Sequence, residues 1–220
     1  MKKLRDCGLS IVLAVCFLIL WAAQSWSGFL VDSQFRRDHG RPSLTYSQYL
    51  GSGHFWQATG ENWESEFLQM GIYVFLGSFL FQRGSAESKD PDAKDEADDP
   101  VENHLNDPGA PAILRKGKLL RWIYSYSLSL AFLSLSAGSF VIHLLGGYAQ
   151  HREEAAAHGE SPQSFGEFLG GAEFWFQSMQ NWQSEFLAVF SIVVLTIWLR
   201  HHASPESKKV WDSHQTTGKA

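Results

Sequence analysis

Two glutamates with matching asparagine neighbours are the residues of this sequence best suited to chemistry. Asn62 and Glu66 lie four residues apart, and Asn181 and Glu185 repeat the same spacing. Residues four apart lie on one face of a helix. Two carboxylates that face each other at one depth in a membrane could hold a cation or share a proton, because loss of water disfavours their charged forms.

A plainer interpretation of the two carboxylates is also open. Each Glu lies near the start of a predicted helix, where the positive end of the helix dipole and the wet headgroup region both favour an acid. The neighbouring acids differ between the two copies, because Glu61 and Glu64 correspond to Gln180 and Gln183. This mismatch favours the plainer interpretation, and an ion or proton site is the alternative.

Three histidines are further candidates. His39 and His158 each precede a glycine that ends a predicted helix, where an imidazole suits the negative end of the dipole. No His, Cys or carboxylate lies at a zinc-site spacing beside either one, so we predict a capping role and no metal. His143 lies within an apolar run. We predict that it makes a hydrogen bond inside the membrane, with a proton relay or a haem or quinone site as the alternative.

Sequence motifs of catalysis give no further candidates. The chain contains no nucleophile elbow, phosphate-binding loop, Cys-x-x-Cys pair or His-Glu-x-x-His motif. We therefore expect no enzyme activity, no catalytic residue and no cofactor.

The candidate residues recur because the sequence contains one unit twice, offset by 119 residues without a gap. Residues 39–68 and 158–187 are identical at 12 of 30 aligned positions, against roughly two expected by chance. Repeats of this kind form equivalent structural units that pack on each other. The chain is therefore predicted to consist of two equivalent halves.

Uncharged stretches in each half predict helices that cross a membrane. Residues 7–31 and 122–150 contain no Asp, Glu, Lys or Arg, and about 20 apolar residues span the hydrocarbon core. Residues 67–82 and 186–199 are shorter runs, which become long enough when the flanking Trp and Arg residues are included. The predicted spans are residues 8–30, 63–83, 122–148 and 182–201.

The start of the chain has a second interpretation. Basic residues, an apolar run and the pair Ala22-Ala23 also resemble a secretory signal peptide. The equivalent stretch of the second half is internal, so we expect the first stretch to be retained as a span.

Basic residues near the span ends predict the orientation. Of the 18 Lys and Arg residues, 14 lie before the first span, between the second and third, or after the fourth. Both termini are therefore predicted to be cytoplasmic. Because each half contains two spans, the halves are predicted to be parallel repeats about an axis along the membrane normal.

The polar segments complete the predicted organisation. Residues 86–107 carry nine acidic and two basic side chains, a composition that cannot bury enough apolar area to fold. Binding of cations or a partner by this acidic segment is the alternative. We predict a repeat unit over residues 1–85, a disordered cytoplasmic linker over 86–118, a second repeat unit over 119–204 and a cytoplasmic tail over 205–220.

The outer loops contain signals for helices. Thr45 with Gln48, and Ser164 with Glu167, form capping boxes at equivalent positions. Each should start an amphipathic interfacial helix that runs on through the following Phe-Trp pair, with its aromatic side in the headgroup layer. The predicted interfacial anchors are Trp26, Trp63, Trp122, Trp182 and Trp198.

Three strings of the first half resemble a known family. They are Ser-Gly-His-Phe at residues 52–55, Glu-Asn-Trp-Glu-Ser-Glu-Phe-Leu-Gln-Met at 61–70, and Phe-Gln-Arg-Gly-Ser-Ala-Glu-Ser-Lys at 81–89. The resemblance is to an uncharacterised family of small bacterial membrane proteins, classified as a domain of unknown function, and it covers nearly the whole chain. It implies a bacterial cytoplasmic membrane location, and it implies no reaction, ligand or catalytic residue.

These observations predict an all-helical integral membrane protein with four spans. We expect a non-enzymatic role in the cell envelope, structural or interaction-based, in contact with the lipid bilayer and not with nucleic acid. Ser134 and Gly138 offer a small-x-x-x-small surface that permits a homo-oligomer, and an envelope protein is the other expected kind of partner. The alternative function is a small channel or secondary transporter for a cation or proton that uses Glu66 and Glu185.

Overall fold

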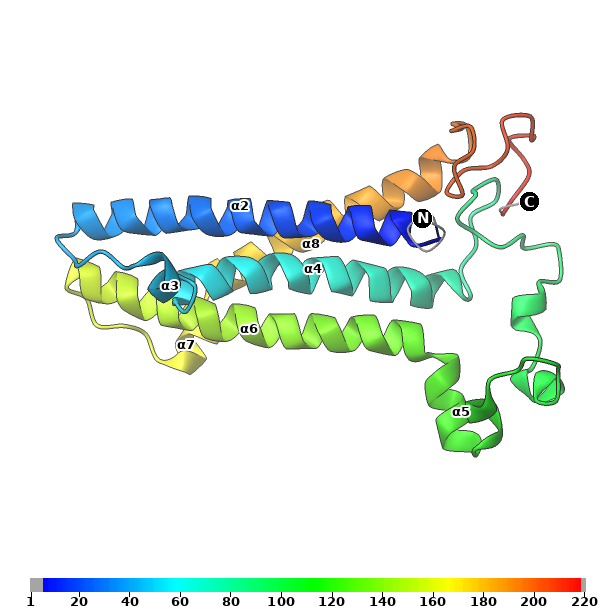
Figure 1. Cartoon of the computed structure of the whole chain (residues 1–220), viewed down its shortest axis with the longest axis horizontal. Helices are drawn as coiled ribbons and strands as arrows, with labels where there is room; N and C mark the ends of the chain where they lie inside the picture. Colours follow the sequence, from blue (N-terminus) through cyan, green and yellow to red (C-terminus); the bar gives the residue numbers. More distant parts are fainter. Residues whose placement is uncertain (1–5, 219–220) are drawn as a thin grey trace. The chain divides into compact units, whose positions relative to one another are not determined.

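The computed structural model describes residues 6–218, and within that range the chain is helical and contains no strand. The predicted all-helical class is therefore confirmed. Figure 1 shows the helices in chain order. Their bounds are α2 (Gly8–Asp38), α3 (Tyr46–Tyr49), α4 (Gly53–Gly77), η1 (Glu96–Asp98), η2 (Val101–His104), η3 (Ala112–Arg115), α5 (Lys118–Ser125), α6 (Ser127–His158), α7 (Phe165–Leu169) and α8 (Ala172–Leu195).

Two of the helices, α2 and α6, are long and apolar enough to cross a membrane by length and composition. α2 begins at the first residue of the predicted span 8–30 and continues to Asp38. α6 begins at Ser127, after a break at Tyr126, whereas the predicted third span starts at residue 122. Ser125 and Ser127 donate their hydroxyls to backbone carbonyls at this break, in competition with regular helix bonding.

The ends of α2 and α6 have the same backbone geometry. Gly40 has a φ of +63°, and the Arg41 N–H donates to the Arg36 carbonyl oxygen at 2.8 Å. This is the bonding of a Schellman motif, in which a left-handed glycine lets the chain leave the helix. The prediction that glycines end these helices is confirmed. The equivalent values 119 residues later are a φ of +71° at Gly159 and 2.8 Å from the Glu160 N–H to the Ala155 carbonyl oxygen.

Both predicted capping boxes are present, at the starts of α3 and α7. The prediction that these helices run on through the Phe-Trp pairs is wrong, because α3 ends at Tyr49 and a new helix begins at Gly53. Ser52 explains the restart, since its hydroxyl accepts the Phe55 N–H at 3.3 Å as an N-cap. The pair Phe55-Trp56 therefore lies on α4.

α4 and α8 are offset from the predicted second and fourth spans. The prediction gives residues 63–83 and 182–201, whereas the helices begin ten residues earlier in each half and end six residues earlier. Both helices start before the apolar runs because polar residues end such a run without interrupting a helix, and these residues are Glu61, Glu64 and Glu66 in α4 and Gln180, Gln183 and Glu185 in α8.

The segments after α4 and α8 are held by matching hydrogen bonds. Lys89 Nζ donates to the Ser78 carbonyl oxygen at 2.9 Å, and Lys208 Nζ donates to the equivalent Ile197 carbonyl oxygen at 3.3 Å. Cations here satisfy carbonyl groups at helix C-termini. Lys208 is 1 % exposed because four more carbonyl oxygens surround its ammonium group, those of Gly84, Ser213, His214 and Thr216.

The acidic segment between the halves contains the short 3-10 helices η1, η2 and η3. Ion pairs connect Lys89 with Asp98 at 2.5 Å and Arg121 with Glu102 at 2.8 Å. Exposed pairs of this kind contribute little to stability. Disorder of residues 86–118 stays a prediction.

The chain divides into two compact units. Unit 1 is Met1–Asn62 with Ser139–Phe176, and unit 2 is Trp63–Gly138 with Gln177–Ala220. Each unit therefore combines stretches of both halves of the sequence.

In unit 1, glycines bring α4 and α6 close together. A Cβ atom on Gly53 would lie 2.6 Å from the Gln150 backbone nitrogen and 2.7 Å from the Gly146 carbonyl oxygen. A Cβ atom on Gly60 would overlap the backbone of His143. Small residues of this kind allow two helix backbones to pack in contact.

Candidate functional site

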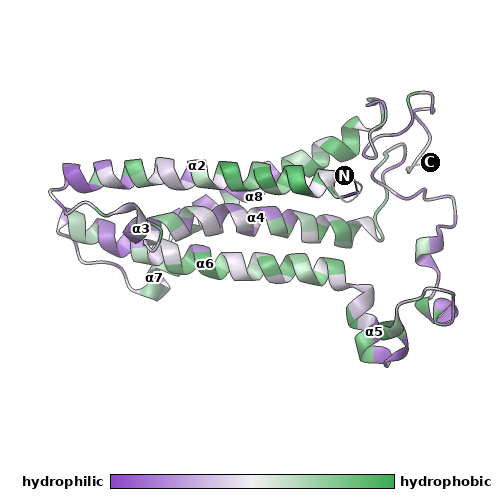
Figure 2. Ribbon diagram, viewed as in Figure 1, coloured by the Kyte–Doolittle hydropathy of each residue, from purple (hydrophilic) through white to green (hydrophobic). Residues whose placement is uncertain are grey.

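The described residues bury polar side chains and expose apolar ones. Seventeen polar or charged residues are buried, against seven apolar residues. Large apolar side chains such as Leu9 and Leu20 are 73 % and 69 % exposed, and Figure 2 shows hydrophobic residues predominating along the N-terminal part of α2. Water-soluble proteins have the opposite arrangement, and an apolar surface of this kind is typical of proteins that contact lipid or another protein.

Glu64 is the buried carboxylate of unit 2. Its residue is 1 % exposed, and the indole Nε1–H of Trp182 donates to its Oε1 at 3.1 Å. Ser136 donates its hydroxyl to the Glu64 backbone oxygen at 2.9 Å. Residues of α4, α6 and α8 therefore meet around Glu64.

Other polar groups are buried in the same unit. Ser65 is 1 % exposed and Ser178 is fully buried. Within residues 6–218, the Ser178 hydroxyl and the Gln69 Oε1 have no hydrogen-bond partner. Buried polar groups usually have a hydrogen-bond partner, so these two atoms are exceptions within the buried part of unit 2.

The predicted carboxylate pair lies nearer the surface than Glu64. Glu66 is exposed and Glu185 is partly buried, and the two are near enough for their charges to repel. Gln69 Nε2 donates to Glu66 at 3.4 Å. The amides of Asn62 and Asn181 donate to the backbone carbonyl oxygens of Ala58 and Gln177, four residues earlier on their own helices, at 2.7 and 3.2 Å.

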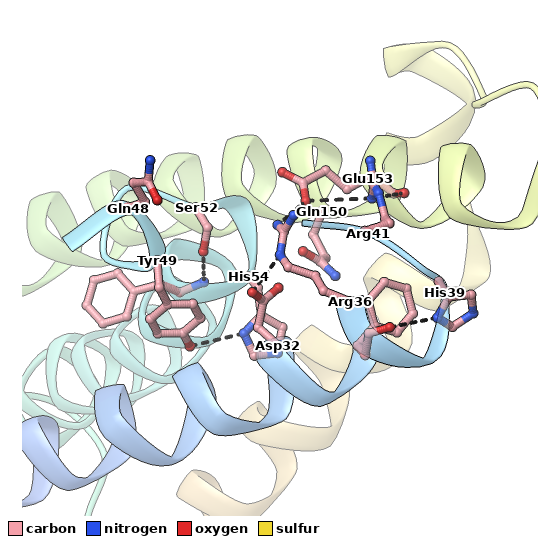
Figure 3. A network of polar contacts seen from close by, with 12 residues as sticks. Asp32, Arg36, His39, Arg41, Gln48, Tyr49, Ser52, His54, Gln150 and Glu153 are labelled. Carbon is pink, nitrogen blue, oxygen red and sulfur yellow. Dashed lines mark hydrogen bonds and ion pairs between the residues drawn. The ribbon is translucent and has the colours of Figure 1, made fainter. Parts of the chain in front are cut away.

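Unit 1 contains a network of ionic contacts at the C-terminal parts of α2 and α6 (Figure 3). Arg36 donates from Nε to Asp32 at 2.7 Å and from Nη2 to Glu153 at 2.5 Å. Asp32 and Arg36 are 3 % and 7 % exposed. Arg41 donates to the Glu153 backbone oxygen at 2.9 Å. The network joins α2 to α6, and the loss of one partner would leave a buried charge unpaired.

Tyr49 and His54 form a second contact in this region (Figure 3), with 3.1 Å between the phenol oxygen and Nδ1. Burial raises the pKa of Tyr49 to about 12. Burial also lowers the pKa of His54 below its ordinary value, although nearby carboxylates, Asp32 first, oppose the change. The imidazole is therefore favoured in its neutral form.

One family model matches the sequence over residues 1–219, and its description is Domain of unknown function (DUF6766). The chain belongs to this family. The resemblance to a domain of unknown function is therefore confirmed. No curated protein and no solved structure matches the chain. Membership in DUF6766 brings no reaction or ligand with it, so functional arguments for this DUF6766 chain depend on its own residues.

His143 of this DUF6766 chain is fully buried in unit 1. Its ring lies 4.7 Å from that of Phe174, centroid to centroid, and its backbone packs against Gly60. This packing favours a structural role for the imidazole.

The predicted tryptophan anchors fall into two groups. Trp26, Trp122 and Trp198 are 53 %, 55 % and 56 % exposed, and their anchoring role stays a prediction. Trp63 and Trp182 are half-buried. Trp182 donates to Glu64, so its indole has a role inside the protein.

Sequence reasoning missed Glu64 because it gave weight to acids that recur in both halves, and the equivalent of Glu64 is Gln183. A usable signal was nevertheless present on α4. Gly60 lies four residues before Glu64 and Gly71 lies seven after it, on the same helix face. Glycines there mark the side on which other helices pack.

Within residues 6–218, no group of three or more His, Cys, Asp and Glu side chains could hold a metal ion.

Proposed function

We propose that this chain is a non-enzymatic, multi-pass protein of the bacterial cytoplasmic membrane that carries protons through a site centred on Glu64. The observation that supports this most is a carboxylate with 1 % exposure inside a protein whose surface is apolar. Ionisable groups inside membrane proteins are costly and mark proton or ion pathways.

The membrane part of the proposal has three supports. α2 and α6 are apolar enough to span. α4 and α8 contain 25 and 24 residues, which extend over about 38 and 36 Å at 1.5 Å each, more than the hydrocarbon core of about 30 Å. Matching hydrogen bonds at an offset of 119 residues support two parallel repeats, and the distribution of basic residues supports cytoplasmic termini.

The hydrogen bond from Trp182 suits Glu64 to proton exchange. An indole N–H can only donate, so Oε1 must accept it whether the carboxyl group is charged or neutral. The Trp182 bond therefore does not require one charge state of the Glu64 carboxyl group, and a proton can bind and leave while the bond to α8 stays intact. The site can change charge without losing the contact that positions it.

Proton flux into proteoliposomes tests the proposal. A pH-sensitive dye inside the vesicles and an imposed potassium diffusion potential would report the flux. Glu64→Gln keeps an oxygen that accepts from Trp182 and removes the titratable group. We expect its flux to fall by about two orders of magnitude, the lower end for loss of a positioned proton-transfer group.

The matched control is the double variant Glu66→Gln, Glu185→Gln, which removes the outer carboxylate pair. We expect this control to keep wild-type flux. Loss of flux in the control with normal flux in Glu64→Gln would move the site to the outer pair. Absence of proton, sodium and potassium flux in the wild type would reject transport.

A structural or interaction-based role in the envelope is the second candidate. It is favoured by the contacts of Glu64 itself, because Trp182 and Ser136 tie three helices together at this residue. On this reading the polar interior holds the helices in register, and the apolar surface contacts the lipid bilayer, a second copy or an envelope protein. The absence of flux in the wild type, with normal folding, would support it.

A further inference from the structure

His39 and His158 are brought together at the ends of two helices in unit 1. His39 follows α2 and His158 is the last residue of α6. Their ring centroids are 4.9 Å apart, with an angle of 72° between the ring planes. Phe35 packs beside His39 at 4.3 Å between centroids. Spacing along the sequence could not reveal this pair, because its members are 119 residues apart.

Each imidazole has one nitrogen held by its own helix. His39 Nδ1 lies 2.8 Å from the Phe35 carbonyl oxygen, and His158 Nδ1 lies 2.8 Å from that of Glu154. A carbonyl oxygen can only accept, so Nδ1 must carry the hydrogen in both rings. In a neutral imidazole the lone pair is then on Nε2.

This tautomer is the one that metal-binding histidines adopt. A ligating imidazole typically donates its other ring N–H to a backbone carbonyl or carboxylate, which fixes the ring orientation and strengthens the ligand. Both rings have that second contact already. His158 is exposed and His39 is half-buried, so an ion can reach them from solvent.

We propose that His39 and His158 bind one zinc ion through their Nε2 atoms. Imidazole nitrogen suits zinc and similar transition metals, whereas calcium and magnesium prefer oxygen. Zn–N bonds of about 2.0–2.1 Å place two ligating nitrogens roughly 3–4 Å apart, and a centroid separation of 4.9 Å is of the size that two imidazoles on one ion require. Water fills the remaining positions, since no cluster of three ligand side chains occurs within residues 6–218.

Such a site would connect α2 to α6 independently of Glu64. In the proposed orientation it faces the outer side of the membrane, where the loops after α2 and α6 lie. Two protein ligands give an open and exchangeable site, unlike the closed four-ligand sites that hold structural zinc. Zinc binding should therefore stabilise the folded protein by an amount that rises with the logarithm of the free zinc concentration once that concentration exceeds Kd.

Zinc titration of the full chain, purified in detergent with a tag that lacks histidine, tests the proposal. Affinity is measured by calorimetry, and thermal stability is measured with and without zinc chloride. His39→Asn and His158→Asn remove Nε2 but keep a donor for the carbonyl four residues earlier, a bond that Asn62 and Asn181 make in this protein. Each variant should weaken binding by at least about tenfold, the lower end of the cost of losing even an outer-shell partner.

The controls separate a specific site from general histidine binding. His202→Asn removes another exposed histidine and should leave the zinc affinity unchanged. His158→Cys supplies a thiolate, which is also a zinc ligand, so this variant should bind zinc more tightly than His158→Asn does. Zinc binding by the Cys variant tests the site even if the Asn variants fold poorly. Unchanged zinc affinity in the His39→Asn, His158→Asn double variant would overturn the proposal, as would equal stabilisation by magnesium chloride.

Discussion

Protonation of His54 should lower the stability of the folded protein in mild acid. Burial lowers the pKa of His54 in the folded state below its ordinary value. Below about pH 6.5 the unfolded chain therefore takes up a proton at this residue more readily than the folded chain does. Stability contributed by neutral His54 is present above the ordinary pKa and is lost as the pH falls through it towards the folded pKa.

We expect the wild type to lose more thermal stability between pH 7.5 and pH 5 than the His54→Asn variant. Asn offers an oxygen near the position of Nδ1, so it can keep the hydrogen bond with Tyr49 while it removes the titration. Melting temperatures in detergent across this pH range measure the difference. Equal slopes for both proteins would contradict the prediction, and His202→Asn controls for the loss of any histidine.

Residue-level features were predictable where they depend on neighbours in sequence. The capping boxes at Thr45 and Ser164 and the left-handed glycines at positions 40 and 159 follow from local hydrogen bonding, and all four are present. Burial of Glu64 and the meeting of His39 with His158 depend on contacts between distant segments. Contacts of this kind cannot be predicted from the spacing of residues along the sequence.

At the scale of the element, the close approach of α4 and α6 is the feature most sensitive to substitution. Gly60→Ala would place a methyl group against the backbone of His143, which cannot move aside as a flexible side chain could. We expect a loss of about 1–3 kcal/mol in the free energy of unfolding, the usual cost of overpacking. Denaturation in mixed detergent micelles, followed by helical circular dichroism, measures the loss.

Gly138→Ala is the matched control, because a Cβ atom there would meet nothing within 4 Å. Alanine is the better helix former by about 0.5–1 kcal/mol, so this variant should be unchanged or slightly more stable. A destabilised Gly138→Ala would indicate that this surface packs against a second copy. The open position fits the predicted small-residue surface for oligomers, which stays a prediction.

Helix existence was easier to predict than helix limits. Both long apolar helices were expected from uncharged runs, and α2 begins at the predicted residue. The bounds of α4 and α8 differ from the predicted spans 63–83 and 182–201 because those spans were built outward from uncharged runs. Glu64 lies inside α4 and is buried, so a rule that looks for uncharged stretches starts later than the helix does.

At the scale of the whole molecule, the proposed topology predicts which loops are reachable from outside the cell. In a background with Cys7→Ser and Cys16→Ser, we would introduce Asn106→Cys in the acidic linker and Ser161→Cys in the loop after α6. A membrane-impermeant thiol reagent should label only the second variant in intact cells. Both should be labelled after the cells are permeabilised.

The opposite labelling pattern would reverse the orientation derived from the basic residues. Labelling of both positions in intact cells would contradict a structure with four spans. A similar expression level for both variants, checked by blotting, keeps the comparison valid.

The single carboxylate at position 64 bears on how such a protein can arise. In a symmetric dimer of two identical two-helix chains, every residue occurs twice, at positions related by the symmetry axis. Such an assembly would contain two glutamates or two glutamines at this site. A fused and duplicated chain is free of that restriction, so Glu64 can occupy one half while Gln183 occupies the other. A fused chain therefore buries one glutamate at this position where a symmetric dimer would bury two, and the free-energy cost of removing carboxylates from water is about half as large.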